Sequence, residues 1–344
     1  MALPPPLRQH PPGALARRSL LLGTAAWCVC AAGCSNGAKS SSPAVASSSP
    51  RSRTTAVAVS SPGPELPAAM AWRPGPGEIQ PAAKLAAVRL VEALGTWPTG
   101  QGGERAAAAR AAALGIPSVL AAQLAAQAGS LAPSADAAVV RVIDAQYGGI
   151  LSDTASVLVV CDQPTHSGAT VRPGGTTVDV RLSRTSSGWG VTALHPAAPG
   201  PAGALDEAAR EVFAQSRIEL PPASAADIRG GAVHDSVLHA MLQLAGTYRL
   251  SVSVVRSGHP LDVFGTNRPS DHPLGRAFDV WRIDGHPVVD PATSRTLISE
   301  FMRAAAAAGS YNVGGPVQLA GGATANQFFS DDTHHDHVHI GFTA

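Results

Sequence analysis

The chain has 344 residues, of which 45% are hydrophobic, and 25 basic side chains nearly balance 24 acidic ones, for a formal net charge of +1. This length and apolar content allow two domains, each with a core of its own. A nearly neutral chain offers no basic surface of the kind that binds nucleic acid, so we expect no nucleic-acid partner. The sequence leaves the oligomeric state open.

The first 34 residues have the pattern of an export signal. Arg8, Arg17 and Arg18 give it a positive start, and the apolar stretch 20–32 is too short for a comfortable membrane span. We therefore expect residues 1–34 to be a signal peptide that is removed from the mature protein.

Two short motifs indicate how this signal is used. Residues 17–21, Arg-Arg-Ser-Leu-Leu, resemble a twin-arginine signal, and residues 31–34, Ala-Ala-Gly-Cys, resemble the lipobox of bacterial lipoproteins, here of the actinobacterial type. This resemblance predicts acylation of Cys34 and attachment to the outer face of the cytoplasmic membrane. Ala31 stands where a lipobox usually has leucine, so simple cleavage and secretion stay open as the alternative.

Residues 35–66 follow as a segment rich in Ser, Pro and Ala with almost no large apolar side chains. Such a segment cannot bury enough surface to offset the entropy of ordering its backbone. We expect it to be a disordered tether between the membrane and the folded domains.

One cysteine, Cys161, lies beyond this tether, because the other three of the four precede residue 35. A single thiol cannot form an intrachain disulfide. Cys161 ends the apolar run 157–161, so we expect it to be a small buried hydrophobic residue rather than a nucleophile.

Residues 67–197 are expected to form a first α+β domain. Helical periodicity starts at Ile79, with Pro81 suited to a first turn, and stops at Pro98, and a second helical stretch covers 117–129. Alternation of apolar and polar residues then predicts the strands of an antiparallel sheet, at 139–145, 156–162, 176–183 and 189–194.

The third of these strands shows the alternation most clearly. Val178, Val180 and Leu182 are expected to face one way, with Asp179 and Arg181 on the other side. Helices followed by an antiparallel sheet resemble the small cone-shaped domains of the nuclear-transport-factor-2 type. The resemblance implies a fold of that type for the first domain.

Residues 198–228 are predicted to be a Pro/Gly-rich linker with a helix, and residues 229–344 a second α+β domain with a small antiparallel sheet. Asp290 can cap one of its helices, which Pro291 opens and Gly309 ends. The elements expected from residue 198 onward are helices at 205–216, 233–248 and 291–309 and strands at 250–255, 277–281, 317–320 and 338–342.

Two motifs in the second domain supply a histidine, a carboxylate and a second histidine. Residues 270–279 read Ser-Asp-His-Pro-Leu-Gly-Arg-Ala-Phe-Asp, and residues 334–339 read His-His-Asp-His-Val-His. His337 and His339 share one face of the last strand. A trio of two imidazoles and one carboxylate is a zinc ligand set with a fourth position left open, as in catalytic zinc sites.

These motifs resemble those of the LAS group of metallopeptidases. Residues 270–279 match S-x-H-x-x-G-x-A-x-D, and residues 337–339 match H-x-H. The first motif is most similar to the D-Ala-D-Ala carboxypeptidase and L-alanyl-D-glutamate peptidase branch, whose members cut peptides of bacterial cell walls. The resemblance covers residues 233–342 and implies that Zn²⁺ is held by His272, Asp279 and His339.

The resemblance also implies which groups act on the substrate. The base that accepts a proton from water is Asp336, three residues before the last ligand, or His337, with Asp336 as its support. An arginine that faces the developing oxyanion is matched by Arg256 or, failing that, by Arg268. Ser270 is expected to shape the turn by hydrogen bonding, and Ser270 and Arg268 are the candidates for substrate contact.

Three further histidines adjoin the motifs. His259 lies near the expected site, and His334 and His335 are open to supporting the ligands, contacting substrate or forming a solvated turn. Gly275 is expected to be a tight-turn residue.

The sequence thus predicts an exported zinc metallopeptidase, a hydrolase that cleaves peptidoglycan stem peptides, as a carboxypeptidase or an endopeptidase. Its expected partners are peptidoglycan peptides and, through Cys34, the membrane. The alternative is a zinc-binding domain without turnover that serves as a wall-binding or assembly module. The third hypothesis is a structural lipoprotein that binds no metal.

Overall fold

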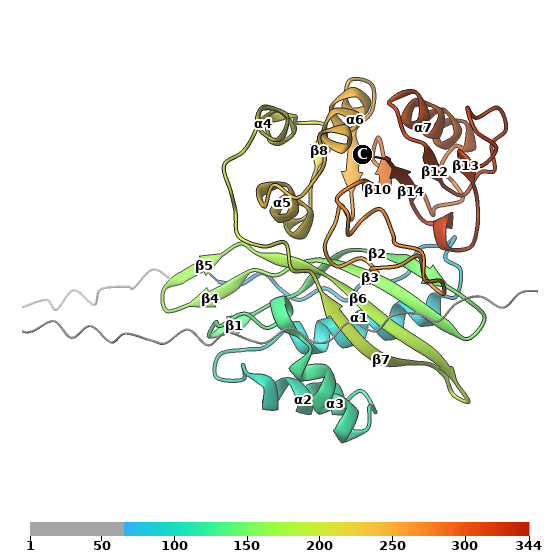
Figure 1. The fold of residues 1–344 in the computed structure, drawn as a ribbon. Helices are drawn as coiled ribbons and strands as arrows, with labels where there is room; N and C mark the ends of the chain where they lie inside the picture. Colours follow the sequence, from blue (N-terminus) through green and yellow to red (C-terminus); the bar gives the residue numbers. More distant parts are fainter. Residues whose placement is uncertain (1–64, 344) are drawn as a thin grey trace, which may run out of the picture. The chain divides into compact units, whose positions relative to one another are not determined.

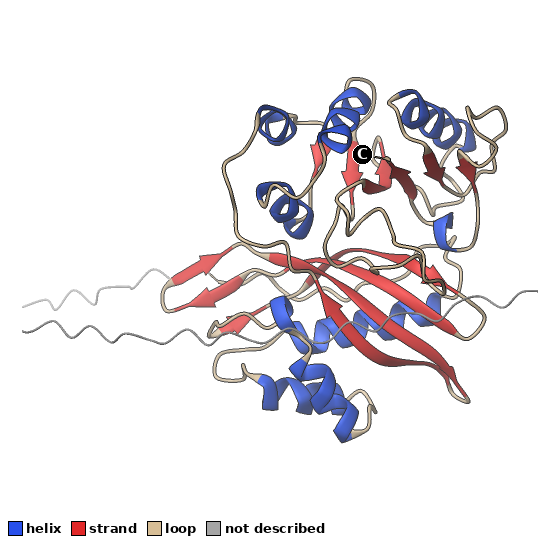
Figure 2. Cartoon of the chain, viewed as in Figure 1, coloured by secondary structure: helices blue, strands red, loops and turns tan. Residues whose placement is uncertain are grey.

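The computed structural model describes residues 65–343 of the chain (Figure 1). The expected signal peptide 1–34 with Cys34, and the expected tether as far as residue 64, lie outside the described residues. Within them the fold is α+β, as expected, with helices packed on largely antiparallel sheets (Figure 2). None of the helices described combines the length and the hydrophobicity that a membrane crossing requires.

The described residues belong to one compact unit, within which the two expected domains correspond to two parts with separate main sheets and separate cores. The first part, which we call the first domain, is built on a four-stranded antiparallel sheet. Its helices are α1 (Pro81–Gly95), α2 (Glu104–Ala112), α3 (Ser118–Ala126) and the short η1 (Gly129–Leu131). Its strands are β1 (Ala137–Ala138), β2 (Arg141–Ile150), β3 (Thr154–Asp162), β4 (Thr165–Ser167), β5 (Thr170–Arg172), β6 (Gly175–Thr185) and β7 (Gly188–Pro196). The main sheet has the order β2-β3-β6-β7, and β1, β4 and β5 form a separate small sheet.

Helix α1 packs on one face of this sheet and closes the core of the first domain. Pro81 occupies its first turn, as predicted. Val88, Val91 and Leu94 on α1 belong to the same buried cluster as the inward-facing side chains of β6. The predicted alternation in β6 is confirmed, because Val178, Val180 and Leu182 all lie in this cluster.

Strand β3 is buried on both of its faces, which explains why its stretch 157–161 is apolar without interruption. Val157, Val159 and Cys161 face the α1 cluster. Leu158 and Val160 face the other way and pack against Val254 of the second domain. Cys161 is fully buried, as expected, and burial raises the pKa of its thiol to about 12. Figure 1 shows β2, β3 and β6 lying between α1 and the second domain.

The second domain is built on a sheet of seven strands with the order β13-β12-β14-β10-β9-β8, to which β11 adds by pairing with β10. From residue 207 the helices are α4 (Glu207–Ala214), α5 (Pro222–Arg229), α6 (Asp235–Ala245), α7 (Arg295–Ala307) and η2 (Thr333–His335). The strands are β8 (Ile218–Glu219), β9 (Leu250–Val252), β10 (Ala277–Ile283), β11 (His286–Pro287), β12 (Asn312–Gly314), β13 (Phe328–Phe329) and β14 (Val338–Gly341).

Two predicted elements differ from the observed ones. The apolar segment 317–320 is not a strand, because β12 pairs with β14 earlier in the chain and leaves Val317 and Leu319 to pack on the core from a loop. Helix α7 begins after Ser294, whose side chain accepts a hydrogen bond from the Leu297 N–H. Asp290 instead accepts one from the Ala292 N–H within the preceding turn.

Candidate metal centre

Two neighbouring strands of the second domain carry two of the three expected ligands. Asp279 on β10 and His339 on β14 are directly paired in the antiparallel register. Side chains alternate across a strand, and the residues flanking these two, among them Phe278 and Ile340, are buried in the core cluster on the opposite face. The alternation therefore presents the carboxylate and the imidazole side by side on the face away from that core.

The third expected ligand, His272, lies in the turn before β10. Its Nδ1–H donates to the Val255 carbonyl oxygen at 2.8 Å, so the lone pair of neutral His272 is on Nε2. The turn requires glycine at position 275. The φ of Gly275 is +72°, and a side chain there would overlap the Ala232 carbonyl oxygen. The turn role predicted for Gly275 is thus confirmed by its backbone.

The three ligand atoms converge on one point. Asp279 Oδ1 lies 3.2 Å from His272 Nε2 and 3.1 Å from His339 Nδ1, and the two nitrogens are 3.2 Å apart. Tetrahedral ligation of zinc at ordinary bond lengths separates ligand atoms by about 3.3 Å. In its neutral form, His272 would turn an unprotonated nitrogen toward a carboxylate oxygen, an arrangement of two acceptors that a proton or a metal ion between them would stabilise. The donor set therefore fits a divalent metal ion.

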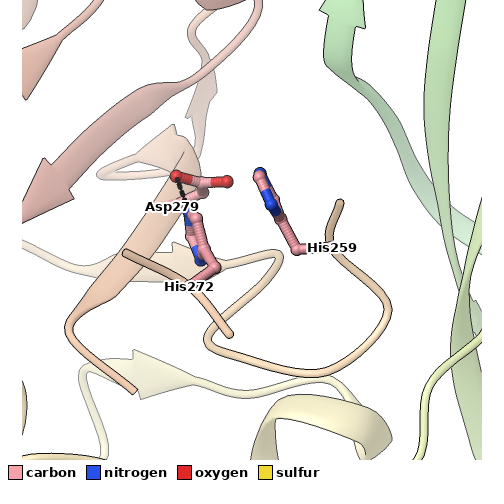
Figure 3. Close-up of side chains that lie close together, drawn as sticks. All are labelled: His259, His272 and Asp279. Atoms are coloured by element: carbon pink, nitrogen blue, oxygen red, sulfur yellow. Dashed lines mark hydrogen bonds and ion pairs between the residues drawn. The ribbon is translucent and has the colours of Figure 1, made fainter. Parts of the chain in front are cut away.

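His259 is a neighbour of this trio that was not expected among the ligands. Figure 3 shows its ring beside His272 and Asp279, and its ligand atom lies within 4.8 Å of theirs. The rings of His259 and His272 stack, with centroids 4.0 Å apart and planes 19° apart. A ligated ion lies in the plane of each imidazole that holds it, so two stacked rings cannot share one without moving. His339, tilted by 56° from His272, has no such conflict.

His337 and Asp336 form a dyad beside the three ligand atoms. His337 Nδ1–H donates to Asp336 Oδ1 at 2.7 Å, and His337 Nε2 lies 3.8 Å from Asp279 Oδ2. The other oxygen of Asp336 accepts from the Lys84 ammonium at 2.6 Å and from the Tyr147 N–H at 3.1 Å. Both oxygens of Asp336 are therefore occupied, and two of these contacts come from the first domain.

The charges of the site follow from this geometry. Burial opposes ionisation of Asp279, but the imidazoles of His272 and His337 keep its pKa well below the ordinary value. Burial also opposes protonation of His337, yet the carboxylates of Asp279 and Asp336 raise its pKa to about 8. Burial lowers the pKa of His339 to about 4, so this ligand is neutral near pH 7.

In a second group of potential ligands, a lysine side chain of the protein occupies the position that a metal ion would take. Glu78, His335 and Asp336 also bring ligand atoms within 4.8 Å of one another. The Lys84 ammonium forms ion pairs with both Glu78 and Asp336 and occupies the place of a cation there. Nearby Asp144 has a buried oxygen without a partner among the described residues, and burial raises its pKa to about 7.

A cleft of about 770 Å³ opens over the metal centre. Its walls come from both domains, with residues 147–151 of the first domain facing the loop 263–272 and η2 of the second. Arg268 and Ser270 line this cleft. Arg256 does not: its guanidinium lies 3.6 Å from the Asp227 carboxylate and lines a neighbouring cavity.

The two histidines of the second motif that were left open have different surroundings. His334 lines the cleft and is held by Asp331, whose Oδ1 is 2.7 Å from its Nδ1. His335 accepts a hydrogen bond from the Ile79 N–H through Nε2 at 3.2 Å, which ties it to the first domain. His334 is therefore available to a bound molecule, whereas His335 connects the domains.

Sequence reasoning missed the contribution of the first domain to this site. Lys84 carried a signal, because it lies four and seven residues before Val88 and Val91 and so shares the buried side of the predicted helix. A charged side chain on that side needs a buried partner. Gln146 and the Tyr147 N–H carried no such signal, since only the docking of two domains brings them to the metal centre.

Comparison of the chain with protein-family models, with curated proteins and with solved structures found no match. The chemistry of the site is therefore inferred from its own residues. Two groups of side chains among the described residues could hold a metal ion, His259 with His272 and Asp279, and Glu78 with His335 and Asp336. His339 Nδ1 lies 3.1–3.2 Å from the ligand atoms of His272 and Asp279 and so adjoins the first group.

Proposed function

We propose that this chain is a zinc-dependent peptidase that cleaves the stem peptides of peptidoglycan. The observation that carries the proposal is the convergence of His272 Nε2, Asp279 Oδ1 and His339 Nδ1, separated from one another by 3.1–3.2 Å. The donor set supports zinc as the metal, because two imidazoles and one carboxylate match catalytic zinc sites with three protein ligands. A zinc ion supplies Lewis acidity that polarises a peptide carbonyl and acidifies a water molecule.

His337 is the general base in this proposal. Its Nδ1–H is fixed on Asp336, so Nε2 is the nitrogen that carries the lone pair once His337 is neutral, above its pKa of about 8, and this atom lies beside Asp279 at the edge of the ligand trio. Asp336 acts through His337, because the Lys84 ammonium and the Tyr147 N–H occupy the oxygen that His337 leaves free. The proton accepted at Nε2 then passes to the leaving amine.

Arg268 is the arginine that this proposal assigns to substrate. It lines the cleft over the ligand trio together with Ser270, whereas the guanidinium of Arg256 is turned to Asp227. A positive side chain on the cleft wall suits a peptide carboxylate or a developing oxyanion. The cell-wall substrate itself rests on the resemblance of residues 270–279 to cell-wall peptidases and on the export signal.

Two further parts of the proposal concern the rest of the chain. We infer a nuclear-transport-factor-2 type of fold for the first domain, which is supported by α1 packed on one face of a four-stranded antiparallel sheet. We also infer that the mature protein is anchored to the outer face of the cytoplasmic membrane through Cys34. Labelling with radioactive palmitate that persists in Cys34→Ala would exclude this anchor.

The test of the peptidase is a reaction with defined stem peptides, read by mass spectrometry. We expect one zinc per chain, new peptide termini, and loss of cleavage with a chelator that is restored by added zinc. His339→Ala should lose the metal, because the trio cannot hold it with two ligands. His337→Ala should retain the metal and lose cleavage by about 10²-fold or more, as expected for a general base.

His166→Ala is the matched control, since His166 lies on β4 of the first domain and away from the cleft. It should retain both zinc and cleavage. Zinc bound at one per chain with no new termini from any stem peptide would reject the peptidase and favour the binding module. Full cleavage by His337→Ala would transfer the role of the base to Asp336.

A further inference from the structure

Strand β2 of the first domain contributes a side chain to the metal centre. Gln146 is 1% exposed and faces away from the core of its own domain, toward β10 of the second. Its Nε2 donates to Asp279 Oδ2 at 2.6 Å, although the two residues are 133 positions apart. The expected metal ligand is therefore held by a domain that lies outside the metallopeptidase-like part of the sequence.

The orientation of the Gln146 amide is fixed by the groups on both of its sides. An ionised carboxylate only accepts hydrogen bonds, so the NH₂ group must face Asp279. The amide oxygen in turn accepts from the Ser253 hydroxyl, and Ser253 is fully buried. The flipped amide would place its oxygen against Asp279 Oδ2. Two acceptors would then face each other without a hydrogen bond in a buried site.

This contact determines which oxygen Asp279 offers to a metal. Oδ2 is engaged by the amide, while Oδ1 lies 3.2 Å from His272 Nε2 and 3.1 Å from His339 Nδ1. Without the amide, the carboxylate could rotate about its terminal bond, and Oδ2 would lack a partner in the buried site. Groups that hold a metal-ligating carboxylate by a hydrogen bond typically contribute ten- to hundredfold to metal affinity.

We propose that Gln146 is a positioning residue of the metal centre. The first domain then contributes a residue to the site and is more than a spacer. The proposal rests on the metal-binding part of the function proposed above. It concerns the affinity for the ion and the geometry around it, so it can be measured without any substrate.

The test compares variants of the full chain by zinc titration in competition with a chelator of known affinity. Gln146→Leu should weaken zinc binding by about ten- to hundredfold. The visible absorption bands of the Co²⁺-substituted protein should also change, because they report ligand geometry. Ser253→Ala, which removes the donor to the amide oxygen, should weaken zinc binding in the same direction and by less.

Gln163→Leu is the matched control. Gln163 is also a buried glutamine of the first domain, but its amide donates to the Gly95 and Leu131 carbonyl oxygens at 2.8 and 2.7 Å and stays within that domain. It should lower the unfolding temperature and leave the zinc affinity and the Co²⁺ spectrum as in the wild type. A purely structural role for Gln146 would make Gln146→Leu behave in the same way.

Zinc affinity in Gln146→Leu within twofold of the wild type, with an unchanged Co²⁺ spectrum, overturns the positioning role. Should Gln146→Leu fail to fold, unchanged affinity in Ser253→Ala overturns it instead. A wild-type chain that binds zinc but cleaves no stem peptide rejects the peptidase and leaves the affinity comparison to decide on Gln146. A wild-type chain that binds neither zinc nor cobalt rejects both.

Discussion

Lys84 of the first domain forms a buried ion pair with Asp336 of the second. The sequence has only two lysines, and the side chain of this one is 0% exposed. Burial works against its charge, but the carboxylates of Asp336 and Glu78 raise its pKa above the ordinary value. Burying an ammonium is costly unless carboxylates pair with it, and here two do so, Glu78 from the first domain and Asp336 from the second.

Replacement of this lysine should therefore destabilise the protein strongly. Lys84→Met keeps the length of the side chain but leaves the buried carboxylates of Asp336 and Glu78 without their cation. Breaking a buried pair in this way costs about 3–5 kcal/mol in the free energy of unfolding. Urea unfolding monitored by tryptophan fluorescence measures the loss.

Arg249→Ala provides the comparison on the surface. Arg249 pairs with Glu219 at 3.4 Å, but the two side chains are 49% and 44% exposed. Such pairs contribute less than about 1 kcal/mol. If Lys84→Met cost no more than Arg249→Ala, the ion pairs of Lys84 would not hold the domains together.

At the scale of elements, the edge strand β2 determines the shape of the cleft. Its Gly149 packs against Phe264 so closely that a side chain at this position would overlap Phe264 Cβ and Cγ. Phe264 belongs to a loop of the second domain, and both residues line the cleft. Because Gly149 has no side chain, this loop can lie directly against β2.

Gly149→Ala should displace that loop. Overpacking of this kind costs about 1–3 kcal/mol in the free energy of unfolding, because the overlap involves the root of the phenylalanine side chain rather than its flexible end. The variant should also lower peptide cleavage, since one wall of the cleft moves. Urea unfolding and the stem-peptide reaction measure the two effects.

Gly203→Ala is the control for this substitution, because the nearest atom to an added side chain there is 3.9 Å away. It should change the free energy of unfolding by no more than about 0.5 kcal/mol. Equal effects of the two alanines would mean that Gly149 is not closely packed.

For the whole molecule, the candidate metal centre is the place where residues of the two domains meet. Gln146 binds Asp279, and Lys84 with the Tyr147 N–H binds Asp336, so residues of the first domain touch both motifs of the second. An ion held by the trio would therefore order groups that are tied to both domains.

We expect zinc to stabilise both domains together. An ion that binds the folded state alone adds about 2.7 kcal/mol at a free concentration one hundred times its Kd. The unfolding temperature should rise with zinc and fall with a chelator. Hydrogen exchange should slow in β2 and β3 as well as in β10 and β14. Slower exchange confined to the second domain would contradict this coupling.

The sequence by itself predicted much of the fold and the convergence of three of the side chains at the candidate metal centre. Helical periodicity with Pro81 predicted α1, and alternation predicted the inward face of β6, because both depend on local geometry alone. The ligand trio was predicted from residue types and spacing in two motifs, and His272, Asp279 and His339 lie together.

Only the tertiary structure decided what surrounds the trio. Whether His337 or Asp336 could act as the base was open in the sequence. The docking of Lys84 and the Tyr147 N–H on Asp336 favours His337. Gln146 reaches Asp279 across 133 positions, and Arg256 turns to Asp227 instead of the cleft. The physical reason is that a periodic pattern reports which face of an element is buried, whereas contacts between distant segments depend on how whole domains pack.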